Sequence, residues 1–355
     1  MPNIIIQATD TLFFRDGRPF SMGDDSFAQG IFPPPPSVIY GALRTVYVAK
    51  GLEDGFSQSA LVAESEELQV NYFSVHDGFV PYFPLPADLI IPKDENRNFH
   101  AFPLKLENAP RFSNGTLPQI LESTKDGKVV DEPILMKRAV LLRYLKGIDS
   151  EFEVQKRSDF TTSEFKIGIG RDKNSNTADD GKLFRVQMTR PANDKMGLRL
   201  CFSIGFEGLD TDENGWLVLG GERRVAFSKP AELNEISMPA IDTPEFKIYL
   251  ATPAFFSAGW KPENLLAKYK LELFAAAVDR PLSVGGWDLK EQTPKPMVQC
   301  VPAGSVFFVR APTVEAAQNA AKEIHGCCIS DNTAQTNFQK QGFGLAFVGK
   351  INQNQ

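Results

Sequence analysis

The stretch DTLFFRDGRPFSMGDDSFAQGIFPPPPSVIYGALRTVYVAK, residues 10–50, decides how the first part of the chain folds. It follows a short apolar segment, Ile4 to Ala8, and leads into an amphipathic segment that begins at Val38. This pattern predicts a β-strand and an α-helix over Val38 to Ala49, joined by a long tether. Connections inside compact domains typically have about 4–6 residues. A tether this long, and this rich in charge and proline, indicates a binding role rather than a simple connection.

Three residues of the tether are candidates for binding an anion. Arg15 and Arg18 lie in a turn marked by Gly and Pro, where their guanidinium groups can point at solvent or at an anion. Ser37 follows four prolines and is a good N-cap for the helix, whose first backbone N–H groups can bind phosphate. The alternative is that both arginines pair with nearby aspartates and that the prolines only stiffen a loop. These aspartates are Asp10, Asp16, Asp24 and Asp25.

The same region carries a family resemblance. The run FFRDGRPFSMGDDSFAQGIFPPPPSVIYGALR, residues 13–44, closely resembles the N-terminus of the subunit that binds the 5′ handle of the guide RNA in type III-B CRISPR (Cmr) effector complexes, a member of the RAMP superfamily. Four further stretches resemble the same family in the same order. They are residues 167–185 (IGIGRDKNSNTADDGKLFR), 219–224 (LGGERR), 281–308 (PLSVGGWDLKEQTPKPMVQCVPAGSVFF) and 342–349 (GFGLAFVG).

Composition and charge are those of a globular protein with one basic region. The 355 residues suffice for two domains with separate cores, and the 28 phenylalanines predict an aromatic interior. The net charge of −6 argues against a free-standing nucleic-acid binder. However, residues 97–199 contain 19 Lys or Arg against 14 Asp or Glu, whereas residues 51–96 contain 1 against 9. This distribution suits a subunit with one face for phosphates, although interspersed solvated charges would give a similar count.

The cysteines and the N-terminus favour a cytoplasmic protein. Four cysteines form no CxxC pair, so we expect reduced thiols and no zinc site. The N-terminus lacks a basic segment before an apolar one, and no apolar run approaches the roughly 18 residues of a membrane span. We therefore expect neither secretion nor membrane insertion. The cysteines are Cys201, Cys300, Cys327 and Cys328.

Hydrophobic periodicity predicts the order β-α-β-β-α-β in the C-terminal third, which is the ferredoxin-like arrangement. The expected strands are 246–251, 283–287, 305–310 and 343–351, and the expected helices are 263–278 and 314–325. In the N-terminal half we expect a helix over 135–145 and strands over 182–188 and 198–206. We predict an α+β fold of two ferredoxin-like (RRM-like) units with long insertions, as the RAMP resemblance also implies. The predicted domains are residues 1–235 and 236–355.

Two glycine-containing stretches add candidate sites. Gly342 and Gly344 fit part of a dinucleotide-binding fingerprint, but no helix is expected after them. The RAMP resemblance implies that this glycine-rich loop lies against RNA, and a bulge needed for packing is the alternative. Arg171 and Lys173 belong to a stretch, Gly168 to Lys173 with the polar residues up to Gly181, that we expect to be a flexible basic loop. That loop either contacts RNA phosphates or is only a disordered surface loop.

Trp287 offers a flat ring next to two glycines, and Lys295 lies nearby in the sequence. Such a ring can stack on a base. An indole this close to a strand is more often part of the core, so both interpretations stay open.

Catalytic motifs are weakly represented. His76, His100 and His325 form no HxH or HExxH pattern, and the chain has no Walker A loop and no nucleophile elbow. Some RAMP relatives use a histidine for metal-free RNA cleavage, so His76 could be a general base, although a surface or core histidine is more common. We expect no catalytic residue, no paired base beside any of the three histidines, no metal and no cofactor.

The resemblance implies a non-catalytic RNA-binding subunit. It would hold the 5′ handle of the CRISPR RNA and contact two neighbours, the large polymerase/cyclase-like subunit and the backbone RAMP subunit, with no membrane involved. The residues expected to contact RNA are Arg15, Arg18, Ser37, Arg171, Lys173, Trp287, Gly342 and Gly344. The first alternative is a metal-independent endoribonuclease that processes the guide-RNA precursor. The second is a small-molecule enzyme with a pocket in the Pro- and Phe-rich region.

Overall fold

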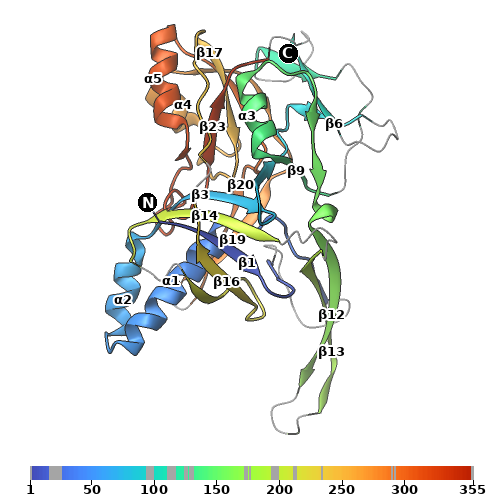
Figure 1. The fold of residues 1–355 in the computed structure, drawn as a ribbon, viewed down its shortest axis with the longest axis vertical. Coiled ribbons are helices and arrows are strands. Elements are labelled where there is room, and N and C mark those ends of the chain that lie inside the picture. Colours follow the sequence, from blue (N-terminus) through green and yellow to red (C-terminus); the bar gives the residue numbers. More distant parts are fainter. Residues whose placement is uncertain are drawn as a thin grey trace.

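A computed structural model of the chain contains two antiparallel sheets, each with its own helices, and two long hairpins (Figure 1). An eight-stranded sheet belongs to the N-terminal half and a five-stranded sheet to the C-terminal half. The predicted combination of helices and sheets is therefore confirmed. The structure describes residues 2–15, 26–92, 100–109, 117–123, 127, 132–171, 175, 177–192, 200–210, 214–232, 235–288, 291 and 293–352.

The eight-stranded sheet is built around β1 (Asn3–Ala8), whose residues alternate between half-buried and buried positions. Ile4 and Ile6 of β1 share a core with Ile39 and Leu43 of α1 (Pro36–Glu53), so α1 covers this face of the sheet. The strand order is β11-β9-β4-β3-β14-β1-β16-β15. The other elements of this layer are α2 (Gln58–Glu64), β3 (Gln69–His76), β4 (Pro81–Pro84), β9 (Ile134–Lys137), β11 (Gln155–Lys156), β14 (Cys201–Glu207), β15 (Gly215–Val218) and β16 (Val225–Pro230).

The five-stranded sheet has the order β18-β21-β17-β23-β22. Alternate residues of β17 (Glu245–Leu250) face opposite sides, and both sides are buried. Phe246 and Ile248 pack with the helices α4 and α5, whereas Tyr249 packs toward the N-terminal half. The remaining elements are α4 (Glu263–Tyr269), β18 (Glu272–Ala277), β21 (Val306–Arg310), α5 (Val314–Ile324), β22 (Cys327–Cys328) and β23 (Leu345–Gly349).

The central strands of the two sheets follow the same order. Taken by their sequence in the chain, β3-β14-β1-β16 and β18-β21-β17-β23 are both arranged second, third, first, fourth. A helix connects the first strand to the second in both halves. Among the described residues, only the C-terminal half has a helix, α5, between the third strand and the fourth. In the N-terminal half the described residues between β14 and β16 form β15 instead.

Smaller elements surround these sheets. Within the described residues, no helix combines the length and the apolar character needed to cross a membrane. The smaller elements are β2 (Ser26–Ala28), η1 (Ser65–Glu67), β5 (Leu89–Ile90), β6 (His100–Pro103), β7 (Lys105–Asn108), β8 (Gln119–Glu122), α3 (Arg138–Lys146), β10 (Phe152–Glu153) and η2 (Arg157–Asp159).

The two halves share a buried core. Tyr144 of α3 packs in one cluster with Phe83, Tyr249 and Phe347, although α3 belongs to the N-terminal half by sequence. Near Tyr249, Lys247 is 1% exposed and its Nζ lies 3.5 Å from Oδ2 of Asp88, which is 0% exposed. The predicted boundary at residue 235 opens a described segment, residues 235–244, that forms neither helix nor strand. The independence of the two domains stays a prediction.

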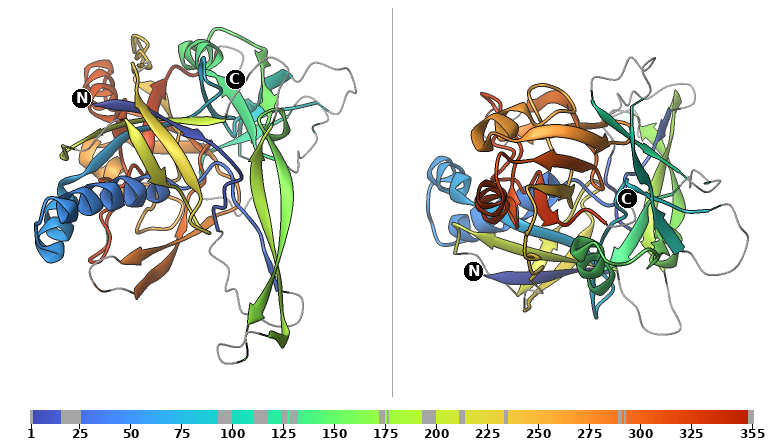
Figure 2. Two further views of the ribbon diagram at one scale, coloured as in Figure 1. Left: turned by 60° about the horizontal axis from the view of Figure 1, so that its bottom comes forward. Right: turned by 90° about the horizontal axis from the view of Figure 1, so that it is seen from above.

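Two hairpins extend from the body (Figure 2). One is formed by β12 (Thr161–Arg171) and β13 (Ala178–Pro191), and the other by β19 (Leu282–Asp288) and β20 (Thr293–Cys300). The expectation that Gly168 to Arg171 form a flexible loop is wrong, because these residues are part of β12. Gly168 pairs with Phe184, whose ring fills the space in front of the glycine, so the strand can continue through it.

Two expected helices are shorter than the sequence pattern predicts. The helix expected over 263–278 ends at Tyr269, because Lys270 adopts a left-handed conformation (φ 53°) and the chain continues as β18. The helix expected over 135–145 begins only at Arg138, after β9. In both cases strand pairing overrides a helical pattern of apolar residues.

Candidate nucleic-acid interface

A groove of about 780 Å³ lies between the first turns of α1, residues 13–15 and the β19–β20 hairpin. Arg15, Ser37, Trp287 and Lys295 all line it. The hairpin lies alongside α1 in the ribbon view (Figure 2). The fold therefore brings together three residues that are far apart in the sequence and were singled out as separate candidates for RNA contact, namely Arg15, Ser37 and Trp287. It places Lys295, which was noted only as a sequence neighbour of Trp287, beside them.

The N-terminus of α1 forms one end of this groove. The helix begins at Pro36 and its N-cap is Pro35, so the prediction that Ser37 is the N-cap is wrong. The reason is that proline suits the first helical position, where its fixed φ fits and its missing N–H is not needed. No side chain caps this end, and Ser37 lies half-buried in the first turn beside the groove.

The β19–β20 hairpin presents Trp287 to solvent. The side chain of Trp287 is 54% exposed, so the interpretation of Trp287 as a core residue is wrong. Trp287 pairs with Pro294, and Gly286 pairs with Lys295 in the opposite strand. A register shift between Val284 and Gly286 interrupts the ladder just before the tryptophan. Its role in base stacking stays a prediction.

The tether arginines are only partly described. Arg15 is exposed, and its backbone pairs with Gly30 in an isolated bridge. This bridge fixes the start of the tether next to its end. Arg18 lies outside the described residues, as does the turn that was predicted to present it.

Gly342 and Gly344 face the interior of the protein. Both have left-handed backbones, with φ of 91° and 77°, and both are buried. A side chain at Gly342 would come within 3.1 Å of Val70 and Pro36, and one at Gly344 within 2.7 Å of the Ser330 backbone nitrogen. Both positions therefore require glycine for the backbone conformation and for close packing. Their contact with RNA stays a prediction.

The second group of basic candidates lies on the other hairpin. Arg171 is the last residue of β12 and pairs with Ala178. Lys173 lies outside the described residues. The β12–β13 hairpin extends away from α1 (Figure 1), and none of its described side chains lines the groove.

Further groove residues escaped the sequence analysis. Gly41 and Thr45 follow Ser37 at intervals of four residues, so helical periodicity could have placed all three on one face of α1. Gln341, which also lines the groove, has no such local signal. It is brought there by the packing of the C-terminal half against α1.

Two of the three histidines have structural partners. His76 is buried and its Nδ1 accepts a hydrogen bond from the N–H of Gly78 (2.9 Å). Burial lowers the pKa of His76. His325 is also held by backbone groups on both ring nitrogens.

His100 has a carboxylate neighbour, Glu151, although we expected no paired base beside any histidine. Its Nδ1 lies 3.0 Å from Oε1 of Glu151. That expectation is wrong for this residue, because β6 and β10 pair and bring residue 100 next to the loop before residue 152. Among the described residues, no group of three potential metal ligands occurs.

Comparison with known proteins gives a family and two structures of similar fold. Residues 4–351 match the family described as CRISPR-associated protein (Cas_Cmr3). A chain in the cryo-EM structure of the Type III-B Cmr-beta bound to cognate target RNA is similar in fold, with 15% identity over 86% of this chain and 86% of that chain and a TM-score of 0.53. A chain in the same assembly with target RNA and AMPPnP gives 14% identity, 88% and 86% coverage and a TM-score of 0.52. No curated protein matches the sequence.

Proposed function

The chain belongs to the Cas_Cmr3 family of CRISPR-associated proteins, and we propose that it is a non-catalytic subunit of the type III-B Cmr effector complex that holds the 5′ handle of the guide RNA. The observation that carries this proposal is the groove in which Arg15, Ser37, Trp287 and Lys295 meet. It combines positive charge, a hydroxyl group and an exposed aromatic ring, which are the groups that bind single-stranded RNA.

Each group has a distinct part in this proposal. Arg15 and Lys295 neutralise backbone phosphates, and the ring of Trp287 stacks on a base. At the start of α1, Pro35 and Pro36 have no N–H and the N–H of Val38 donates to the carbonyl oxygen of Pro35 (3.0 Å). In this proposal the backbone N–H and the hydroxyl of Ser37 therefore bind a phosphate, which the positive end of the helix dipole attracts. Because the whole chain has a net charge of −6, we expect the isolated subunit to bind RNA weakly and the assembled complex to bind it tightly.

The β12–β13 hairpin supports a contact with a neighbouring subunit. Phe165, Ile167 and Ile169 occupy alternate positions of β12, so they share one face, and they are 53–63% exposed. Leu183, the partner of Ile169 in β13, extends the same apolar face. Exposed apolar surfaces of this kind mark protein interfaces. In this proposal the chain bridges the large polymerase/cyclase-like subunit and the backbone RAMP subunit.

We also propose that both halves are variants of the ferredoxin-like unit. The shared strand order of the two sheets supports this assignment. In the N-terminal unit, β15 occupies the place of the second helix, between the third and fourth strands. The β12–β13 hairpin is the longest insertion of this unit.

The competing function, a metal-independent endoribonuclease, has one candidate site in His100 and Glu151. Incubating the purified complex with repeat RNA, with and without EDTA, tests it. We expect no cleavage that depends on this chain. EDTA-resistant cleavage that His100→Ala abolishes would favour the nuclease.

The proposed function is tested by purifying the tagged chain from a host that carries the CRISPR locus and sequencing the bound small RNA. We expect guide RNAs with a common 5′ handle. Recovery of the assembled complex without such RNAs would contradict the proposal.

A further inference from the structure

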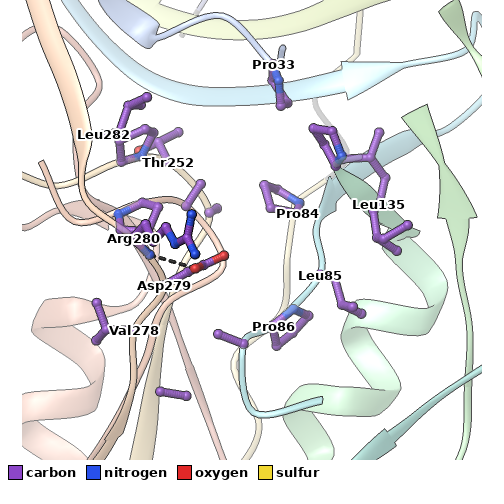
Figure 3. A pocket seen from close by; sticks show the side chains of 18 of the residues that line it. Pro33, Pro84, Leu85, Pro86, Leu135, Thr252, Val278, Asp279, Arg280 and Leu282 are labelled. Atoms are coloured by element: carbon purple, nitrogen blue, oxygen red, sulfur yellow. Dashed lines mark hydrogen bonds between the residues drawn. The ribbon is translucent and has the colours of Figure 1, made fainter. Parts of the chain in front are cut away.

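A second and larger cleft lies where the N-terminal and C-terminal halves meet (Figure 3). Its volume is about 1250 Å³, and most of its lining is apolar. Pro84 and Pro86 from the N-terminal half face Thr252 and Leu282 from the C-terminal half across the cavity. Among the described residues, none of the candidates for RNA contact singled out from the sequence lines this cleft.

Arg157 reaches this cleft from the turn between β11 and β12. Its Nε donates to Oγ1 of Thr161 (3.2 Å), and its Nη2 donates to Oγ1 of Thr189 (3.2 Å). The guanidinium carbon lies 5.4 Å from the centroid of the Phe32 ring. Uncharged groups from three separate segments therefore hold this cation in place.

The nearby carboxylate is engaged elsewhere. Glu132 also lines the cleft, but its Oε2 accepts the N–H of Ser158 (2.9 Å) and its Oε1 accepts the hydroxyl of Ser158 (3.1 Å). Burial lowers the pKa of Arg157, and Glu132 opposes this shift. The group nevertheless stays protonated, because the ordinary pKa of arginine is so high. On the facing wall, Arg280 extends into the cavity beside Asp279, whose carboxylate accepts the backbone N–H of Arg280 (Figure 3).

We propose that this cleft is a nucleotide subsite for the guide RNA, in which Arg157 binds a phosphodiester and the attached base packs against the proline-lined wall. The inference rests on the proposed function, because the guide must reach this chain. A partly desolvated guanidinium in a fixed orientation is suited to bidentate contact with a phosphate. Apolar walls with a few polar groups are typical of ligand sites, and pockets of roughly 300–1000 Å³ hold a drug-sized molecule. The cleft is therefore large enough for a nucleotide.

The test is chemical footprinting of the guide RNA in the reconstituted complex. Arg157→Gln is compared with a control, Arg143→Gln. Arg143 lies on α3 and forms an ion pair with Asp149, so the control also removes an arginine, but from outside the cleft. We expect Arg157→Gln to lose protection at a short run of adjacent handle nucleotides while the guide stays bound, and Arg143→Gln to match the wild type. An unchanged footprint in Arg157→Gln would overturn the subsite. A wild-type complex without a protected handle would instead contradict the proposed function.

A measurement on the unaltered protein covers the case in which Arg157→Gln destabilises the fold. Guide RNA carrying 4-thiouridine in the handle is photo-crosslinked in the wild-type complex, and the crosslinked peptides are identified by mass spectrometry. Crosslinks to peptides containing Tyr82 and Pro86 support the subsite, because no residue of β4 or of the segment after it lines the groove beside α1. Crosslinks confined to other surfaces overturn it. Thermal stabilisation of the RNA-free chain by micromolar AMP, abolished in Arg157→Lys, would assign the cleft to a free nucleotide and overturn the guide-RNA assignment.

Discussion

His325 connects two backbone segments as a neutral hydrogen-bonding group. The N–H of Val348 donates to its Nδ1 (3.1 Å), so the ring proton is on Nε2, which lies 2.7 Å from the carbonyl oxygen of Ile236. Burial lowers the pKa of His325. The side chain thus ties the last strand, β23, to the segment between the two halves, and protonation of Nδ1 would break one of these bonds.

This arrangement predicts a loss of stability in mild acid. Because the pKa of His325 is lower in the folded than in the unfolded chain, the unfolded chain binds more protons below its own pKa of about 6.5. The stabilisation is present above that value and is lost as the pH falls toward the folded pKa. We expect the free energy of unfolding, from urea titrations between about pH 5.5 and 6.5, to fall by up to about 1.4 kcal/mol per pH unit for this one group. His325→Gln should reduce the slope, and an identical slope would contradict the assignment.

Gly344 gives a second residue-level prediction, with Gly326 as its control. Both glycines have positive φ (77° and 75°), so alanine costs each about 1–2 kcal/mol of backbone strain. Only Gly344 is also crowded, because a Cβ there would lie 2.7 Å from the backbone nitrogen of Ser330, whereas nothing lies within 4 Å at Gly326. We expect Gly344→Ala to lower the free energy of unfolding more than Gly326→Ala. Equal losses would show that packing against Ser330 does not matter.

At the scale of secondary structure elements, local signals predict some elements and mislead on others. The helix over 314–325 is observed as α5, because Thr313 accepts the N–H of Ala316 and Gly326 follows the last turn, as the sequence indicates. The expected helix over 263–278 is wrong in its second half, because alanines compatible with a helix are recruited into β18 by pairing with β21. Strand pairing between distant segments leaves no signal in a local window.

The break at Lys270 can be tested directly. Lys270 has a φ of 53°, a conformation that glycine adopts without strain and β-branched residues avoid. We expect Lys270→Gly to raise the free energy of unfolding by up to about 1 kcal/mol, and Lys270→Val to lower it. In an uninterrupted helix, Lys270→Gly would instead cost about 1 kcal/mol. Chemical denaturation of the three proteins distinguishes these outcomes.

At the scale of the whole molecule, the two halves are joined by buried polar groups as well as by apolar packing. The hydroxyl of Tyr144 donates to Oδ1 of Asp88 (2.7 Å), and Nζ of Lys247 lies 3.6 Å from the centroid of the Tyr144 ring. The hydroxyl of Tyr249 donates to the carbonyl oxygen of Pro84 (2.6 Å). These contacts fix the walls of the cleft between the halves, so they act on the proposed nucleotide subsite as well as on stability.

Removing one charged member of this network should lower the free energy of unfolding more than neutralising both charges. Lys247→Met leaves the buried carboxylate of Asp88 without its cation, and we expect a loss of about 3–5 kcal/mol in the free energy of unfolding. The double variant Lys247→Met/Asp88→Asn keeps an acceptor for Tyr144 and should recover part of that loss. A double variant less stable than Lys247→Met would contradict this account.

The groove shows how far the sequence could lead. Arg15, Ser37 and Trp287 were found because each stands in a local pattern of its own, namely a charged turn, a proline-capped helix and a tryptophan after two glycines. Their meeting in one groove depends on the packing of the C-terminal half against α1. Arg157 was missed because a cation between two strands has no distinctive spacing in the sequence. Its place in the cleft, its contact with Phe32 and its hydrogen bonds to two threonines come only from the fold.

The most direct test of the central claim is the affinity of the reconstituted complex for guide RNA when Trp287 is replaced. Stacking on an aromatic side chain contributes about 1–3 kcal/mol per base, so Trp287→Ala should weaken binding of the handle roughly 5- to 150-fold. Trp216 is the control, because it is 65% exposed on β15 and does not line the groove. The account predicts wild-type affinity for Trp216→Ala. Wild-type affinity for Trp287→Ala, or an equal loss in both variants, would contradict it.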